Sequence, residues 1–128
     1  MVYDQRVACE CVRIKAYLWM CDQDDMESGW TIEDNTFDTI NMCMFVGGGR
    51  QNIVRSNTFI NCTVPVHVDA RGMGWMQCGP NQTYPSQFIE QLQKLDWQQP
   101  PWSKRFPDID ITTTPCAPAL NVVEDNRY

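Results

Sequence analysis

The sequence predicts an all-β fold, a parallel β-helix of few turns, on three observations. An eight-residue motif is written three times, two of its copies lie 22 residues apart, and apolar residues alternate with polar ones inside each repeat. A 22-residue unit with two or three short strands is too small to bury its own apolar face. Such units must therefore stack on one another to build a core.

The motif reads WTIEDNTF at 30–37, NIVRSNTF at 52–59 and NVVEDNRY at 121–128. Phe37 falls on Phe59 at an offset of 22, and the third copy follows the second at 69, which is one period of 22 plus 47 inserted residues. We expect matched positions of the three copies to lie side by side, with Asn over Asn and aromatic over aromatic.

The residues between the motifs specify strands rather than hairpins. Val64, Val66 and Val68 alternate with Pro65, His67 and Asp69, so the valines share one face of a strand. The recurring Asn suits a bend, because Asn tolerates left-handed backbone and its amide can pass hydrogen bonds between stacked units. A hairpin meander is disfavoured because no Asn-Gly turn separates the strands, and the leucine-rich-repeat signature is missing.

Residues 24–128 resemble the right-handed parallel β-helix proteins of the pectate-lyase-like superfamily. The resemblance rests on an Asp-Asp…Ser-Gly-Trp segment, Gly-Gly-Gly-Arg at 47–50, His-Val-Asp-Ala-Arg-Gly at 67–72 and Pro-Pro-Trp-Ser-Lys-Arg-Phe-Pro at 100–107. It implies a carbohydrate-active protein, a polysaccharide lyase or glycoside hydrolase acting on an extracellular polysaccharide. The alternatives are a non-catalytic glycan-binding or structural module, or a fragment with no independent activity.

The chain divides into four predicted parts. Residues 1–23 form an N-terminal segment or partial rung, 24–72 form β-helix rungs, 73–120 form a loop excursion with a short helix near 86–97, and 121–128 begin a further rung. Because the chain ends on a rung whose apolar face needs a neighbour, we expect a C-terminal fragment of a longer β-helix. The excursion is interpreted as a cover on the side of the β-helix, with a substrate lid as the alternative.

Charge and composition restrict the partners. The formal net charge of −6 and the scattered basic residues argue against nucleic acid, whose binding needs clustered Lys and Arg. No run of 18 apolar residues exists, so no membrane span is expected. The N-terminal residues lack the order of a signal peptide, yet the resemblance implies an extracellular protein.

The seven cysteines and the single histidine do not have the spacing of a zinc site. We expect most cysteines to be buried free thiols on strands, since Cys packs as a small hydrophobe. Cys78 and Cys116 flank the excursion and are placed to staple it in an oxidising compartment. Glycosylation patterns at Asn61 and Asn81 agree with secretion.

The candidate catalytic residues are His67, Asp69, Arg71 and Asp25. The first three occupy outward-facing positions at the end of the strand 64–68, by its alternation. Counting back two periods from Asp69 gives Asp25. Two strand spacings separate these carboxylates by about 9–10 Å, near the upper end of the range for an inverting pair. The structural alternatives are a local ion pair between Asp69 and Arg71, a surface role for His67, and a tight corner at Gly47–Gly49.

The candidate substrate-binding residues are Arg50, Lys104 and Arg105, which could face an acidic polymer, and Trp75 and Trp102, which could stack on sugars. The tryptophans could equally anchor the loop. No metal site is predicted, and Ca²⁺ enters only by analogy with lyases of the superfamily. The predicted partner is a polysaccharide.

Overall fold

The computed structural model describes residues 21–23, 26–74, 90–91, 93–108 and 116–128. The regular secondary structure of these residues is almost entirely β-strand, so the fold is all-β, as predicted. The strands are β1 Cys21–Gln23, β2 Thr31–Glu33, β3 Thr36–Asp38, β4 Met42–Val46, β5 Ile53–Arg55, β6 Thr58–Ile60, β7 Val64–Val68 and β8 Val122–Glu124. One short helix, α2 Trp102–Arg105, lies among the described residues together with isolated helical residues at 90–91 and 93–94.

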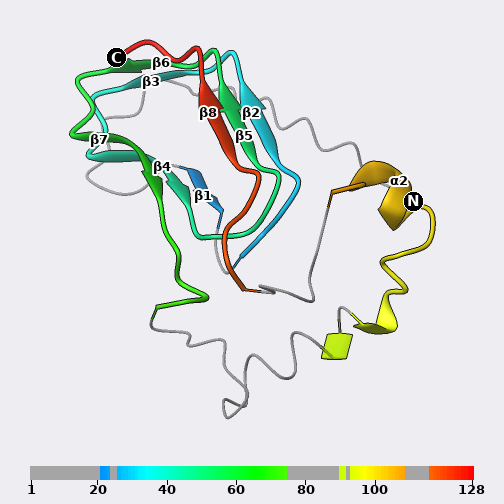
Figure 1. Cartoon of the computed structure of the whole chain (residues 1–128). Helices are drawn as coiled ribbons and strands as arrows, with labels where there is room; N and C mark the ends of the chain where they lie inside the picture. The colour runs from blue at the N-terminus through cyan, green and yellow to red at the C-terminus, as the bar shows by residue number, and fades with distance from the viewer. Residues whose placement is uncertain (1–20, 24–25, 75–89, 92, 109–115) are drawn as a thin grey trace.

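The strands form three short parallel sheets, ordered β1-β4-β7, β2-β5-β8 and β3-β6. Each sheet takes one strand from the first repeat (30–46) and one from the second repeat (52–68), as Figure 1 shows for the neighbouring β2, β5 and β8. The register is the predicted one, since Phe37 pairs with Phe59 and Val46 with Val68. The third repeat (121–128) pairs β8 with β5 at the predicted offset of 69.

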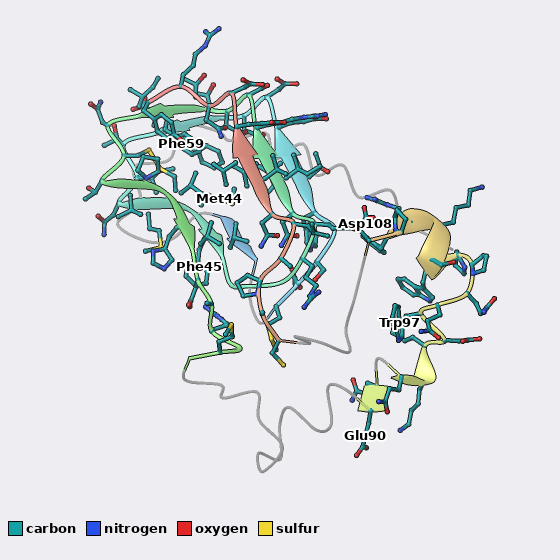
Figure 2. All side chains as sticks on the ribbon, in the orientation of Figure 1. Met44, Phe45, Phe59, Glu90, Trp97 and Asp108 are labelled. Atoms are coloured by element: carbon teal, nitrogen blue, oxygen red, sulfur yellow. A yellow bond between two sulfur atoms is a disulfide. The ribbon has the colours of Figure 1, made fainter. Side chains whose placement is uncertain are left out.

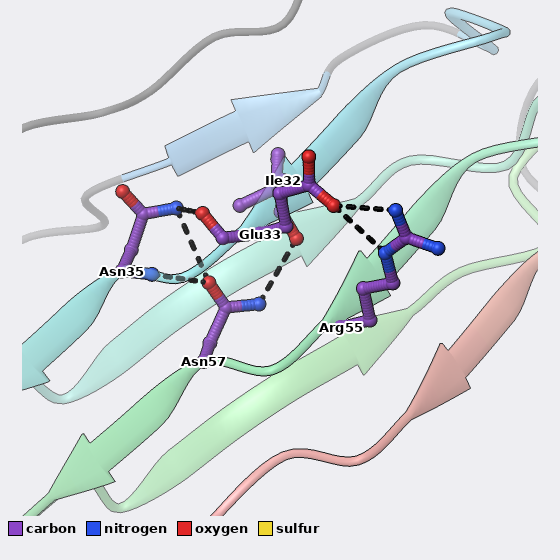
Figure 3. A network of polar contacts seen from close by, with 5 residues as sticks. All are labelled: Ile32, Glu33, Asn35, Arg55 and Asn57. Carbon is purple, nitrogen blue, oxygen red and sulfur yellow. Dashed lines mark hydrogen bonds and ion pairs between the residues drawn. The ribbon is translucent and has the colours of Figure 1, made fainter.

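The motif's Asn residues form the predicted column inside the repeats. The backbone N–H of Asn35 donates to Oδ1 of Asn57 at 3.0 Å, and the N–H of Asn57 donates to Oδ1 of Asn126 at 2.9 Å. The Asn57 side chain also donates through Nδ2 to the carbonyl oxygen of Ile32 at 3.0 Å (Figure 3). Buried backbone groups at the bend are thereby satisfied by side chains of adjacent repeats.

The prediction that Asn itself adopts left-handed backbone is wrong. The residue before each Asn does so: Asp34, Ser56 and Asp125 have φ of 60°, 54° and 53°. A single left-handed residue turns the chain between two strands, and the following Asn is then placed to form its buried hydrogen bonds. Asp and Ser carry this conformation with short polar side chains that stay exposed.

The core lies between the three sheets. The rings of Phe37 and Phe59 stack with centroids 5.0 Å apart, and Tyr128 continues the column at 5.7 Å from Phe59. The buried cluster consists of Ile32, Phe37, Ile40, Cys43, Met44, Val46, Val54 and Phe59. Matched positions of successive repeats therefore pack against each other, as the repeat predicts.

A disulfide joins Cys43 of the first repeat to Cys62 of the second. The prediction of free thiols is wrong for this pair, because stacking brings together two cysteines from adjacent repeats. Cys116 is buried and also disulfide-bonded. Cys78 lies outside the described residues, so its proposed link to Cys116 stays a prediction.

The first strand departs from the period. Cys21 pairs with Met44 and Gln23 with Val46, an offset of 23. The N–H of Met26 donates to the carbonyl of Gly47, 21 residues later, the spacing that the bonds from Asp34 and Thr39 also have where the register offset is 22. Between Gln23 and Met26 the chain therefore contains one residue more than the neighbouring segment after Val46. The count that led to Asp25 crosses this irregularity, and Asp25 itself lies outside the described residues.

The excursion (73–120) is only partly described. Helical residues occur at 90–91 and 93–94 and a turn follows at 95–98, so the helix ends before the predicted limit of 97. The sequence analysis did not identify α2, which begins directly after Pro101. No helix in the described part of the chain is long and apolar enough to cross a membrane.

Candidate functional site

Three of the four predicted catalytic residues gather around Phe45, and we call Phe45, His67, Asp69 and Arg71 the outer-face cluster. Phe45 on β4 pairs with His67 on β7, and their rings stack with centroids 5.3 Å apart and an interplanar angle of 11°. Arg71 Cζ lies 4.6 Å from the centroid of Phe45. Arg71 Nε lies 3.5 Å from Asp69 Oδ2, an ion pair longer than a good hydrogen bond.

The alternation of β4 explains this arrangement. Met44 and Val46 belong to the buried core, so Phe45 between them points to the outer face. Phe45 is nevertheless only 4% exposed, and Arg71 only 7%. Arg71 therefore lies on the outer face, as expected, but it is buried rather than open to solvent, because its guanidinium lies over the Phe45 ring as a cation–π cover.

The members of the cluster differ in how far their side chains can be reached from solvent. The charge of Arg71 is engaged with Asp69 and Phe45, as the local ion-pair interpretation predicts. His67 is exposed, and the Asp69 side chain is 31% exposed, so both can be reached from solvent. The accessible pair is thus an imidazole and a carboxylate held beside a buried cation.

The glycines at 47–49 form the tight corner that the structural alternative predicts. Gly48 and Gly49 have φ of 89° and 71°, in the region that favours glycine. A Cβ on Gly49 would overlap the carbonyl oxygen of Glu27, and one on Gly48 would touch Met26. Backbone of the preceding segment therefore fills the space beside Gly49.

Three of the predicted substrate-binding residues lie on α2. We call these three residues and Phe106, which follows the helix, the α2 cluster: Trp102, Lys104, Arg105 and Phe106. Trp102 stacks on Phe106 with centroids 6.5 Å apart, and Arg105 Cζ lies 4.9 Å from the Phe106 centroid. A Cβ on Gly29 would lie 2.7 Å from the Phe106 ring, so Phe106 anchors α2 against the repeats. Trp102 is 38% exposed, and Lys104 and Arg105 are also exposed.

The two clusters do not converge. In Figure 1 the helix α2 lies on the opposite side of the picture from β4 and β7. Figure 2 likewise separates Phe45 on the strands from Trp97 and Glu90 in the excursion. The outer-face cluster and the α2 cluster therefore lie on two surfaces rather than in one cleft.

Among the described candidates, Arg50 belongs to neither cluster. Arg50 is 6% exposed and its main chain bridges to Ala119, so it offers little surface to a bound polymer. Asp25 and Trp75 lie outside the described residues. Among the residues that are described, no three His, Cys, Asp or Glu side chains are grouped to hold a metal ion.

The sequence analysis missed Phe45 and a column of charge on the outer surface. Arg55 Nη2 lies 2.6 Å from Glu33 Oε2, and Arg55 Nε donates to the same oxygen at 2.8 Å (Figure 3). The hydrogen bond and the charge of Glu33 raise the pKa of Arg55 above its ordinary value. The signal was present, since Glu33 and Arg55 lie 22 residues apart, as do Phe45 and His67.

No protein-family model, curated protein or solved structure matches this chain.

Proposed function

We propose that this chain is a module of a right-handed parallel β-helix that binds an acidic polysaccharide outside the cell. The β-helix interpretation is supported by three parallel sheets that each receive one strand from the first repeat and one from the second, and by the column of Asn side chains. These features agree with the resemblance to the pectate-lyase-like superfamily. In such a fold the core is structural, so function depends on the outer surface.

The α2 cluster carries the binding proposal. It presents an exposed indole ring and two exposed cations within four residues, in a chain whose net charge is −6. An indole face stacks on the apolar face of a sugar ring. A guanidinium or ammonium group forms charge-assisted hydrogen bonds with a carboxylate. Together these groups suit a polymer of uronic acids.

The extracellular part of the proposal is supported by the disulfide between Cys43 and Cys62. Disulfides persist in oxidising compartments and are rare in the cytosol of mesophiles. Asn61, which heads a glycosylation pattern beside this disulfide, is exposed.

The binding proposal is tested by titrating the protein with soluble polygalacturonate. We expect Trp102→Ala to weaken binding by about 1–3 kcal/mol, the scale of a lost aromatic anchor, and Trp102→Phe to retain most of the affinity. Replacing Lys104 and Arg105 by Ala should remove the salt dependence of binding. Lys94→Ala, which removes an exposed cation outside the cluster, is the matched control. Unchanged affinity in Trp102→Ala would contradict the proposal.

An enzyme, either a polysaccharide lyase or a glycoside hydrolase, is the second candidate. The observation that favours it is the grouping of His67, Asp69 and Arg71 on the outer face of β4 and β7. In a lyase, His67 would accept the proton from the carbon next to the uronate carboxylate, and the C–H electrons would form the C=C bond. The bond from the neighbouring carbon to the glycosidic oxygen would break, with its electron pair leaving on that oxygen, which would take a proton from water. In a hydrolase, Asp69 would need a second carboxylate such as Asp25.

Activity is measured by the absorbance of unsaturated uronides and by new reducing ends. A lyase or hydrolase should lose activity in His67→Asn and Asp69→Asn while keeping polymer affinity, because the α2 cluster is separate from these residues. Binding without either product supports the non-catalytic module. The remaining alternative, a fragment with no independent activity, predicts neither binding nor a cooperative melting transition.

A further inference from the structure

Asn61 differs from the asparagines of the motif. Asn57 is buried, and its side-chain amide donates to the carbonyl of Ile32 and to Oδ1 of Asn126. Asn61 is exposed, and its side chain makes no hydrogen bond to any residue that the structure describes. The carboxamide of Asn61 is therefore not used to satisfy buried backbone, and it can be reached from solvent.

The exposure of Asn61 is a property of its corner. Asn61 turns the chain between β6 and β7 with a φ of 53°, and its counterpart in the first repeat, Thr39, has a φ of 60°. The second repeat lies directly on Thr39, whose N–H donates to the carbonyl of Ile60, and Thr39 is exposed all the same. A repeat stacked on Asn61 would therefore leave its side chain in solvent, because the corner directs this side chain away from the core.

Asn61, Cys62 and Thr63 form the acceptor pattern of N-linked glycosylation. Thr63 is exposed as well, so the carboxamide and the hydroxyl of the pattern reach the surface at the same corner. The left-handed backbone alone accounts for an Asn at position 61, since Asn tolerates that conformation. It does not account for an exposed hydroxyl two residues later.

We propose that Asn61 is the acceptor of an N-linked oligosaccharide, which is attached before the corner folds. In this transfer Nδ2 of Asn61 forms a bond to the anomeric carbon of an oligosaccharide carried on a lipid diphosphate. The bond from that carbon to the diphosphate oxygen breaks, the oxygen keeps the electron pair, and Nδ2 loses a proton. The glycan adds a bulky, hydrophilic group to the surface. The proposal rests on the extracellular part of the proposed function.

The folded corner explains why attachment comes first. Cys62, the middle residue of the pattern, is joined by a disulfide to Cys43, and the N–H of Val64 donates to the carbonyl of Asn41. These bonds hold Asn61 in its left-handed conformation. A transferase that reads the carboxamide and the hydroxyl together needs an extended segment, which the unfolded chain offers and this corner does not.

The glycan would lie away from the α2 cluster. In Figure 1 the corner between β6 and β7 is on the opposite side of the picture from α2. An oligosaccharide at Asn61 therefore leaves the exposed indole and the two cations of that cluster open to a polymer.

The test expresses the chain behind a cleavable secretion leader in a eukaryotic cell, with Asn81→Gln as the background so that one acceptor pattern remains. We expect mass spectrometry of the total recovered protein to show a glycan that peptide N-glycosidase F removes, and tandem mass spectrometry to place it at Asn61. Thr63→Ala should lose the glycan, whereas Thr63→Ser, which keeps the hydroxyl, should retain it. Both variants keep Asn61 and therefore its left-handed corner.

The order of events is tested with unglycosylated protein, purified transferase and lipid-linked oligosaccharide. The reduced, unfolded chain should be modified at Asn61, and the folded, disulfide-bonded chain should not. The proposal is overturned if the Asn81→Gln protein carries no glycan, if Thr63→Ala keeps it, or if the folded chain is modified as readily as the unfolded one. Failure of the proposed function would appear separately, as absence of polygalacturonate binding or as free thiols at Cys43 and Cys62.

Discussion

The repeats and the excursion are stabilised in different ways. In the repeats, interior side chains pack in columns on matched residues of the neighbouring repeat, as with Phe37 on Phe59. In the described part of the excursion most side chains are exposed, and contact with the repeats occurs at single anchors such as Phe106 on Gly29. A substitution inside the repeats therefore disturbs a column, whereas one in the excursion disturbs a local contact. The following substitutions test that difference.

The largest difference is expected between two Gly→Ala changes. Gly49→Ala combines a φ of 71° with overlap of the new Cβ and the Glu27 carbonyl, so we expect a loss of about 4 kcal/mol or more in the free energy of unfolding. Gly74→Ala, at the start of the excursion, meets only ordinary contacts, the nearest atom lying 3.7 Å away, and should change stability by about 0.5 kcal/mol or less.

Urea unfolding followed by far-ultraviolet circular dichroism measures both variants. If Gly49→Ala does not fold, loss of the cooperative transition is itself the expected result. Equal midpoints for Gly49→Ala and Gly74→Ala would show that the corner does not pack against Glu27 in solution.

An intermediate difference is expected for two side-chain amides. Asn57→Ala leaves the buried Asn35 N–H and Ile32 carbonyl without their partner, so we expect a loss of about 2–3 kcal/mol. Gln93→Ala removes an exposed amide from the excursion and should be within about 0.5 kcal/mol of the parent protein. Midpoints of urea unfolding give both values, and a neutral Asn57→Ala would mean that the Asn column contributes little.

The smallest effect in the repeats is expected on their outer surface. Glu33→Gln breaks the ion pair with Arg55, but this pair is solvent-exposed, so the unfolding midpoint should change little. Because the folded pKa of Arg55 is raised, its contribution is present below the ordinary arginine pKa and is lost only as pH rises through the raised value. Near neutral pH, titration of Arg55 should therefore not change the difference in stability between the parent protein and Glu33→Gln.

The period allowed much of the strand pairing to be predicted. Stacking units must align like residues, so the partners of Phe37, Val46 and Asn57 follow from the sequence offset alone. The backbone at the bends could not be assigned in this way, because Asp34 and Asn35 are both residues that tolerate a left-handed conformation. The offset of 23 at β1 could not be predicted, because β1 precedes the first copy of the motif and has no second copy with which its register can be compared.

The site was less predictable than the fold. Alternation placed His67 and Asp69 on the outer face, but gave no sign that Arg71 would be buried over Phe45. That burial depends on how the chain turns after β7, which no period specifies. Likewise the separation of the α2 cluster from the outer-face cluster depends on the path of a non-repeating segment.

The most direct test of the stacked repeats is the disulfide between Cys43 and Cys62. Trypsin cleaves after Arg50 and Arg55, so the two cysteines fall on different peptides when the oxidised protein is digested without reduction. Tandem mass spectrometry of the linked peptides should assign the bond to Cys43 and Cys62. A different partner for either cysteine, or free thiols at both in the oxidised protein, would contradict the stacking of residues 22 positions apart.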